Sequence, residues 1–288
     1  MAKETHVGKK LMETNCYVCH AVSGAKENRI APPMISIKEH YISENTTKEE
    51  FIAAMQNWIK NPTEENVKMH NAVKQFGIMP RQHYPENTIQ KIAEYMFNND
   101  IEKPVWHKEN DKERAKQKHK QATNFTNLPY DERGLKYALS TKAVLGKNLM
   151  GKIQKEGTLA ALDFCNIKAF PLTDSMSVVH KATIKRVSDK PRNYKNKANS
   201  LENEYITIFK EDAKANKESK PIVVETAKNV KVYYPIKTNG MCLQCHGKPN
   251  SDIKPNTLTQ INKLYPKDLA KGYSENQIRG IWNVSFQK

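Results

Sequence analysis

A Cys-x-x-Cys-His motif occurs twice in this chain, and it constrains the fold more than any other feature of the sequence. The copies span residues 16–20 and 242–246 and use four of the five cysteines. The pattern is typical of c-type haem attachment, in which two thiols add to the haem vinyl groups and the histidine binds the iron. The sequence thus predicts two c-type haems, bound covalently by Cys16, Cys19, Cys242 and Cys245, with His20 and His246 as iron ligands.

Two other kinds of site also use Cys-x-x-Cys pairs. A zinc site can be built from two such pairs, and thioredoxin-like proteins use one as a redox centre. Neither requires a histidine directly after the second cysteine, whereas haem attachment does. Because that histidine follows both pairs, haem attachment is the preferred interpretation.

The charge of the chain limits its partners and its compartment. The net charge is +16 at pH 7, which favours an acidic redox protein or an anionic membrane surface as partner. Nucleic acid binding is not expected, because covalent haem attachment is normally completed outside the cytoplasm. No apolar run is long enough to span a membrane, and the first residues lack the apolar core of a signal peptide. We therefore expect a periplasmic protein whose signal peptide has been removed; its oligomeric state is left open.

Periodic apolar residues predict helices in the first part of the chain. A capping box at 47–50 begins a helix that Pro62 ends. Further helices are expected over 69–76, with Gly77 as cap, and over 89–97. This part of the chain is thus expected to be all-α.

Within residues 1–99, a series of positions matches one known haem family: Gly8, Cys16, Cys19, His20, Pro32, Met79-Pro80 and Tyr95. This segment resembles the class I cytochromes c. The resemblance implies that the Pro32 carbonyl orients the haem histidine and that Met79 is the second iron ligand, with His83 as the alternative. It also implies that Gly8 and Tyr95 pack where the terminal helices cross. The other methionines of this segment are expected in the core or on the surface.

The rest of the chain reads as a charged linker, residues 100–132, followed by an α/β domain, residues 133–288. In the latter, a long helix is expected to be interrupted at Gly157 and to end before Pro171. Strands are expected at 182–187, 222–235 and 281–286, with a helix at 201–210.

Residues and short segments spread over nearly all of this second domain match one known family in the same order: Cys165, Ala169, Pro171, Arg192-Asn193, Asn196, Glu202, Cys242–Gly247, Tyr265–Tyr273 and Ile278–Gly280. It resembles a family of PAS-like single-haem domains of bacterial periplasmic and sensor proteins. One departure is Tyr194, where that family usually has a proline. The resemblance implies that Cys165 binds the second haem iron opposite His246. By itself such a thiol is more often a small buried apolar residue. Met176, His180 and Met241 are weaker ligand candidates.

These features together predict a dihaem electron-transfer protein. A Cys/His haem has a lower potential than a Met/His haem, so electrons would pass from the second haem to the first and on to a redox partner. Two alternatives stay open. One is a haem-based redox or gas sensor for NO or CO, and the other is a dihaem peroxidase or nitrogen-oxide enzyme, which needs an open iron. An enzyme is the less favoured interpretation because no paired acid and base is evident.

Overall fold

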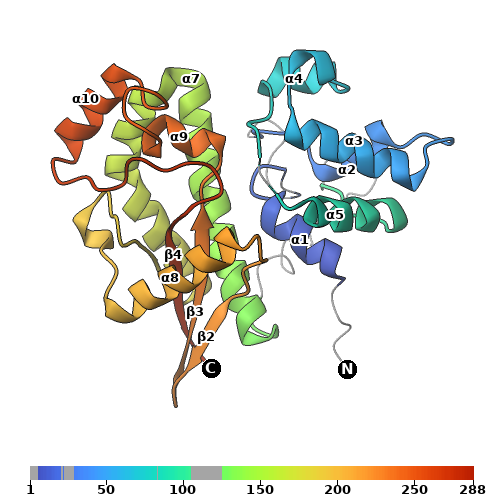
Figure 1. Ribbon diagram of the computed structural model, residues 1–288. Coiled ribbons are helices and arrows are strands. Elements are labelled where there is room, and N and C mark those ends of the chain that lie inside the picture. The colour runs from blue at the N-terminus through green and yellow to red at the C-terminus, as the bar shows by residue number, and fades with distance from the viewer. Residues whose placement is uncertain (1–5, 21, 23–28, 83, 105–124) are drawn as a thin grey trace. The chain divides into compact units, whose positions relative to one another are not determined.

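A computed structural model describes residues 6–20, 22, 29–82, 84–104 and 125–288 (Figure 1). The chain separates into two compact units, Met1–Asn124 and Phe125–Lys288, which we call unit 1 and unit 2. Most of the predicted linker, residues 105–124, lies outside the described residues. None of the described helices is long and apolar enough to cross a membrane.

The described part of unit 1 is helical. Thr47 caps the longest early helix as predicted, because its Oγ1 accepts from Glu50 N while its own N–H donates to the Glu50 carboxylate. Gly77, at φ 78°, ends a later helix. The elements are α1 (Val7–Asn15), α2 (Met34–Tyr41), α3 (Lys48–Lys60), the 3₁₀ turn η2 (Glu64–Asn66), α4 (His70–Phe76) and α5 (Glu86–Asn98).

Helices α1 and α5 pack through a glycine. A Cβ built on Gly8 would lie 2.2 Å from Lys91 O and 2.6 Å from Tyr95 Cβ. Only glycine permits so close an approach, so the predicted packing of Gly8 on Tyr95 is confirmed. The core beside this crossing is formed by buried residues of α1, α2, α3 and α5: Leu11, Met12, Met34, Phe51, Met55, Ile89, Ile92 and Met96.

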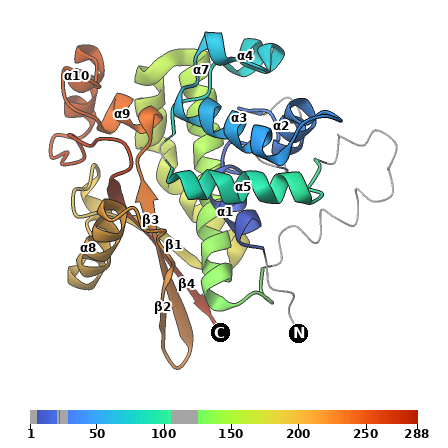
Figure 2. The ribbon, with the colours of Figure 1, turned by 45° about the vertical axis from the view of Figure 1, so that its right-hand side comes forward.

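Unit 2 begins with a helical hairpin. Helix α7 (Tyr130–His180) contains Gly157 with φ 83° and ψ 177°, a conformation outside the helical region. A straight helix would separate Ser140 from His180 by roughly 60 Å at 1.5 Å per residue. Instead, Ser140 Oγ lies 2.7 Å from His180 Nε2, so the chain turns back at Gly157 (Figure 2). The predicted interruption is confirmed, whereas the end predicted before Pro171 is wrong.

Four antiparallel strands form the sheet of unit 2, in the order β1-β4-β3-β2. Apolar residues cover both of its faces. One face packs on α7 through Ile184, Val230, Val232, Trp282, Val284 and Phe286, and the other packs on α8 through Val187, Tyr233, Ile278 and Ile281. The remaining elements are β1 (Thr183–Val187), η4 (Tyr194–Asn196), α8 (Ser200–Lys214), β2 (Ile222–Glu225), β3 (Asn229–Lys237), α9 (Gly240–His246), α10 (Pro255–Leu264) and β4 (Ile278–Gln287).

The predicted fold class, an all-α class I cytochrome c domain followed by an α/β PAS-like domain, is wrong. The described chain is mostly helical, with one small four-stranded antiparallel sheet. The physical reason is that helices bury much of the apolar surface of the second half. The 51-residue α7 alone covers one face of the sheet, and packing of its second arm outweighs the hydrogen bond lost at Pro171.

Candidate haem sites

The first motif extends the last turn of α1. Cys16 N donates to Met12 O at 2.8 Å, and His20 N donates to Cys16 O at 2.9 Å. Residues three and four apart lie on the same side of a helical turn. This turn therefore brings Cys16, Cys19 and His20 to one side. All three side chains are half-buried, and neither cysteine forms a disulfide bond.

The His20 ring is held by a backbone carbonyl, as the sequence predicted. Its Nδ1 lies 2.7 Å from Pro32 O. Since a carbonyl oxygen only accepts, Nδ1 carries the proton and Nε2 keeps its lone pair. Burial lowers the pKa of His20, which favours this neutral ring. A neutral imidazole with a free Nε2 lone pair is the form that binds a metal.

Met79 lies in a loop that is tied to the first motif. The side chain packs half-buried against the core of unit 1, as does Cys16. Further along the same loop, the Tyr84 hydroxyl donates to Asn15 O at 3.3 Å. The loop is thus anchored at the residue preceding Cys16. The alternative ligand His83 lies outside the described residues.

The second motif forms the short helix α9, which starts at a cap that sequence reasoning missed. Asn239 Oδ1 accepts from Cys242 N at 3.3 Å, and Asn239 N donates to Cys242 Sγ at 3.5 Å. The thiol occupies the place that Glu has in an ordinary capping box. Cys242, Cys245 and His246 are again half-buried, and both cysteines are free.

His246 is held in the same way as His20. Its Nδ1 lies 2.8 Å from Ala270 O, which makes Nδ1 the donor and leaves the Nε2 lone pair free. Burial, and next the charge of Arg279, lower the pKa of His246 well below its ordinary value. Two backbone hydrogen bonds fix the same segment, from Gly272 N to Gly247 O at 2.8 Å and from Tyr273 N to His246 O at 2.9 Å.

A buried ion pair supports this second site. The Arg192 guanidinium pairs with Asp268 and donates to the carbonyl oxygens of Cys245 at 2.5 Å and Ala270 at 3.3 Å. Asp268 Oδ1 also accepts from Ala270 N at 2.8 Å. Arg192 therefore joins the end of the motif to the residue that orients His246. The sequence series included Arg192 and Asp268 but assigned them no role.

Cys165 lies on the second arm of α7, beside the second motif. Three residues of that arm contact α9 or α10: Thr158 donates to Gln244 at 2.9 Å, Asp163 accepts from Gln260 at 2.6 Å, and Leu162 shares a core cluster with Cys245, Ile253 and Ile261. Burial raises the pKa of the half-buried Cys165 thiol, while the charges of Arg186, Arg192 and Arg279 oppose that rise. The same three charges act on His246, so Cys165 and His246 share one electrostatic environment.

The weaker ligand candidates of unit 2 differ in their surroundings. His180 is buried, stacks on Tyr137 with ring centroids 4.5 Å apart, and contacts Ser140. Met176 packs against the core between α7 and the sheet. Both have ordinary packing roles there. Met241 is half-buried within α9.

Two of the motif thiols are shielded from solvent. Burial raises the pKa of Cys16 to about 12 and that of Cys245 to about 11. Redox-active pairs and zinc sites depend on thiolates. Among the described residues, no three His, Cys, Asp or Glu side chains are grouped so as to hold a metal ion.

Comparison with known families gives one match, to the Tll0287-like family, over residues 38–287. The chain belongs to the Tll0287-like family. Its match runs through the predicted boundary at residues 100–132, so this one family spans parts of both predicted domains. No curated protein matches the chain.

One solved structure is similar to this member of the Tll0287-like family. It is described as the crystal structure of the cyanobacterial heme-protein Tll0287. The two chains share 18% sequence identity with a TM-score of 0.42, and the alignment covers 54% of this chain and 94% of that chain.

Proposed function

We propose that this chain is a periplasmic dihaem c-type cytochrome that transfers electrons to a redox partner. The observation that carries the proposal is the matching arrangement of the two motif histidines. Each has Nδ1 hydrogen-bonded to a backbone carbonyl, of Pro32 or Ala270, beside two cysteines that form no disulfide bond. A single site of this kind could serve another purpose. Two sites with the same arrangement, formed by distant parts of the sequence, favour one haem at each. The family match to Tll0287-like proteins and the description of Tll0287 as a heme-protein agree with this.

The chain has a simple role at each motif. Cys16 and Cys19, and likewise Cys242 and Cys245, would hold a haem through thioether bonds, each thiol adding its sulfur and its hydrogen across one vinyl group. The carbonyls of Pro32 and Ala270 hold the imidazole rings and raise their basicity toward iron. When bound, haem supplies one-electron transfer between ferric and ferrous iron.

We further propose Met79 and Cys165 as the second iron ligands. Met79 is supported by the anchoring of its loop at Asn15, and Cys165 by its place on the arm of α7 that packs on α9 and α10. A thiolate lowers the potential of a haem relative to a thioether. Electrons would then move from the haem of unit 2 to that of unit 1. The net charge of +16 favours an acidic protein or an anionic membrane surface as the partner that this chain contacts.

Haem stoichiometry tests the cofactor. Haem staining after denaturing electrophoresis, with a pyridine haemochrome count, should give two covalent haems per chain. Replacing both Cys16 and Cys19 by Ser, or both Cys242 and Cys245, should remove one haem each time. Retention of two haems in either double variant would show that attachment does not use that motif.

Electron paramagnetic resonance of the ferric protein tests the ligands. We expect two low-spin signals, with the thiolate-type signal lost in Cys165→Ala and the other changed in Met79→Ala. Asn166→Ala, at the exposed next position of α7, is the matched control and should leave both signals intact. A strong high-spin signal in the unaltered protein, with carbon monoxide binding after reduction, would favour gas sensing or catalysis instead.

A further inference from the structure

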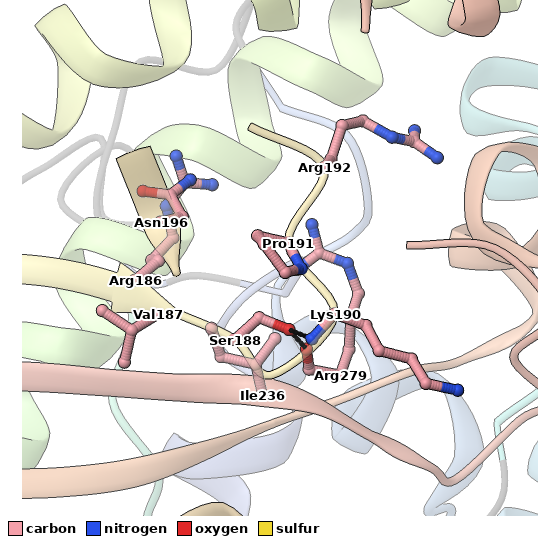
Figure 3. A pocket seen from close by; sticks show the side chains of 9 residues that line it. All are labelled: Arg186, Val187, Ser188, Lys190, Pro191, Arg192, Asn196, Ile236 and Arg279. Carbon is pink, nitrogen blue, oxygen red and sulfur yellow. Dashed lines mark hydrogen bonds between the residues drawn. The ribbon is translucent and has the colours of Figure 1, made fainter. Parts of the chain in front are cut away.

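Unit 2 contains a pocket rich in arginine (Figure 3). One lining residue, Arg192, donates to Cys245 O of the second motif. The cavity of about 30 Å³ is lined by four cationic residues, Arg186, Lys190, Arg192 and Arg279, and by no acidic residue. A cavity of this volume has room for roughly two water-sized atoms, about the size of one carboxylate group. Such a pocket suits an anionic group better than a larger neutral ligand.

A β-bulge accounts for the presence of Arg279 in this pocket. On β3, Ile236 and Lys237 are consecutive, yet their partners on β4 are Gly280 and Ile278. Arg279 is therefore the extra residue of a bulge, which re-aims a side chain. Simple alternation from Ile281 would place Arg279 on the α8 face; the bulge places it with Ile236 and Arg186 in the pocket.

Two of the three guanidinium groups have no acidic partner among the residues that the structure describes. Arg279 Nε is buried without a hydrogen-bond partner. Arg186 has the Trp282 ring, with Cζ 6.0 Å from its centroid, as its neighbour. By contrast, Arg192 is paired with Asp268. Burial, and next the charge of Arg279, lower the pKa of Arg186 to about 10. Unpaired buried charges of this kind are costly, so the fold alone does not balance them.

The unpaired arginines lie within electrostatic reach of the haem-binding residues. The charges of Arg186 and Arg279 both act on His246 and on Cys165. The anion that balances them is therefore expected beside the second haem. Haem itself carries propionate carboxylates, and the pocket has room for one such group. Arginine is well suited to it because its planar fork binds a carboxylate through two hydrogen bonds.

We propose that Arg186 and Arg279 bind one propionate carboxylate of the haem attached at Cys242 and Cys245. This inference rests on the proposed function. The bulge at Arg279 and the inward position of Arg186 on β1 thus form the anionic-group subsite of the second haem.

Resonance Raman spectroscopy and redox titration of the full chain with both haems test this inference. Arg186→Gln and Arg279→Gln should each shift the propionate bending band. Each should also shift the one-electron reduction equilibrium of the second haem about tenfold toward the ferric form, a potential about 59 mV lower. Loss of a nearby positive charge stabilises the more positive ferric state. The first haem should not respond, which makes it an internal control.

Two further variants keep the test decisive. Lys185→Gln removes the same charge from the exposed neighbouring position of β1 and should change neither the band nor the potential. Arg279→Lys keeps the charge but loses the planar fork, so the band should shift while the equilibrium stays within about threefold. If the Gln variants do not fold, the Lys variant still gives the spectroscopic answer.

Inorganic phosphate separates the two possible sources of an anion. With the propionate in place, phosphate should not change the potential of the unaltered protein. A phosphate-dependent potential, with an unchanged propionate band in the arginine variants, would show that a free anion occupies the pocket and overturn the inference. Haem staining of the same samples separates a failure of this inference from a failure of the proposed function. The absence of covalent haem at residues 242–246 would overturn both. Two haems with no response to either Gln variant overturn this inference alone.

Discussion

Arg192 donates to both carboxylate oxygens of Asp268, from Nε at 3.3 Å and from Nη2 at 3.2 Å, and the Asp268 side chain has no exposed surface. This pair fixes the position of Ala270, whose carbonyl holds His246. The ion pair therefore links the stability of unit 2 to the orientation of His246, the proposed iron ligand. Its loss should affect both.

Asp268→Asn should reduce the free energy of unfolding by about 3 kcal/mol or more, because it leaves the Arg192 charge buried without its partner. Denaturant unfolding of the full chain measures this loss. Lys271 also contacts Asp268, at 3.5 Å, but is more exposed. Lys271→Gln is thus the matched control and should cost less than about 1 kcal/mol. Equal losses in the two variants would contradict a special role for Arg192.

Gly8→Ala should destabilise unit 1. The new methyl group would lie 2.2 Å from the carbonyl oxygen of Lys91, so α1 and α5 must move apart, at a cost of about 1–3 kcal/mol. Gly151→Ala is the control, because a Cβ there meets no heavy atom within 4 Å. That substitution within α7 should stabilise the protein by about 0.5–1 kcal/mol. Thermal unfolding distinguishes the two, and a stabilising Gly8→Ala would refute the close packing.

Gly157→Ala should strain the turn of the α7 hairpin. No heavy atom lies within 4 Å of a Cβ placed there, so the cost comes from the backbone, at φ 83° and ψ 177°. This region is almost restricted to glycine and costs other residues about 1–3 kcal/mol. The free energy of unfolding should fall by that amount relative to the unaltered protein, whereas Gly151→Ala should raise it. An unchanged stability would mean that the turn adapts to another conformation.

His180 should make unit 2 sensitive to mild acid. Burial lowers its pKa from 6.5 to about 4, so the unfolded chain binds the proton more readily than the folded chain. The stability contributed by the neutral ring is present above pH 6.5 and is lost as the pH falls toward 4. The loss should be on the order of 2 kcal/mol.

A pH series of unfolding experiments on the unaltered protein and on His180→Gln measures this difference. The variant should be less stable at neutral pH but should lose less stability between pH 6.5 and 4. His70→Gln, at the exposed start of α4, should follow the unaltered protein. Parallel curves for the protein and His180→Gln would rule out His180 as the cause.

Local signals in the sequence predicted much of what the structure shows. The capping box at Thr47 and the interruption at Gly157 depend on the residue itself or its near neighbours, whereas the contact of Gly8 with Tyr95 was implied by a family resemblance. The bond from His20 to Pro32 joins residues only 12 apart. Such features can be inferred without knowing which distant segments meet.

Features that depend on distant segments were missed. Ala270, which holds His246 from 24 residues away, carries no sequence signal of its own. The position of Arg186 could have been predicted. Strand alternation from buried Ile184 places Arg186 on the same inward face, and a buried arginine needs an anionic partner. The bulge at Arg279 has no such signal. The sheet is small because the long α7 hairpin buries much of the apolar surface of unit 2. Local strand propensity does not predict that hairpin.

The central place of β4 determines the order in which unit 2 can be assembled. This strand comes last in the sequence yet lies between β1 and β3, pairing Ser285 with Thr183 on one side and with Lys231 on the other. Pairings between such distant residues form slowly. Residues 242–246 therefore leave the ribosome, and any translocation channel, before the strand that closes the sheet. Under the proposed function, Cys242 and Cys245 would be accessible for haem attachment while the chain is still open, and closure by β4 would then bring Arg279 to the proposed site.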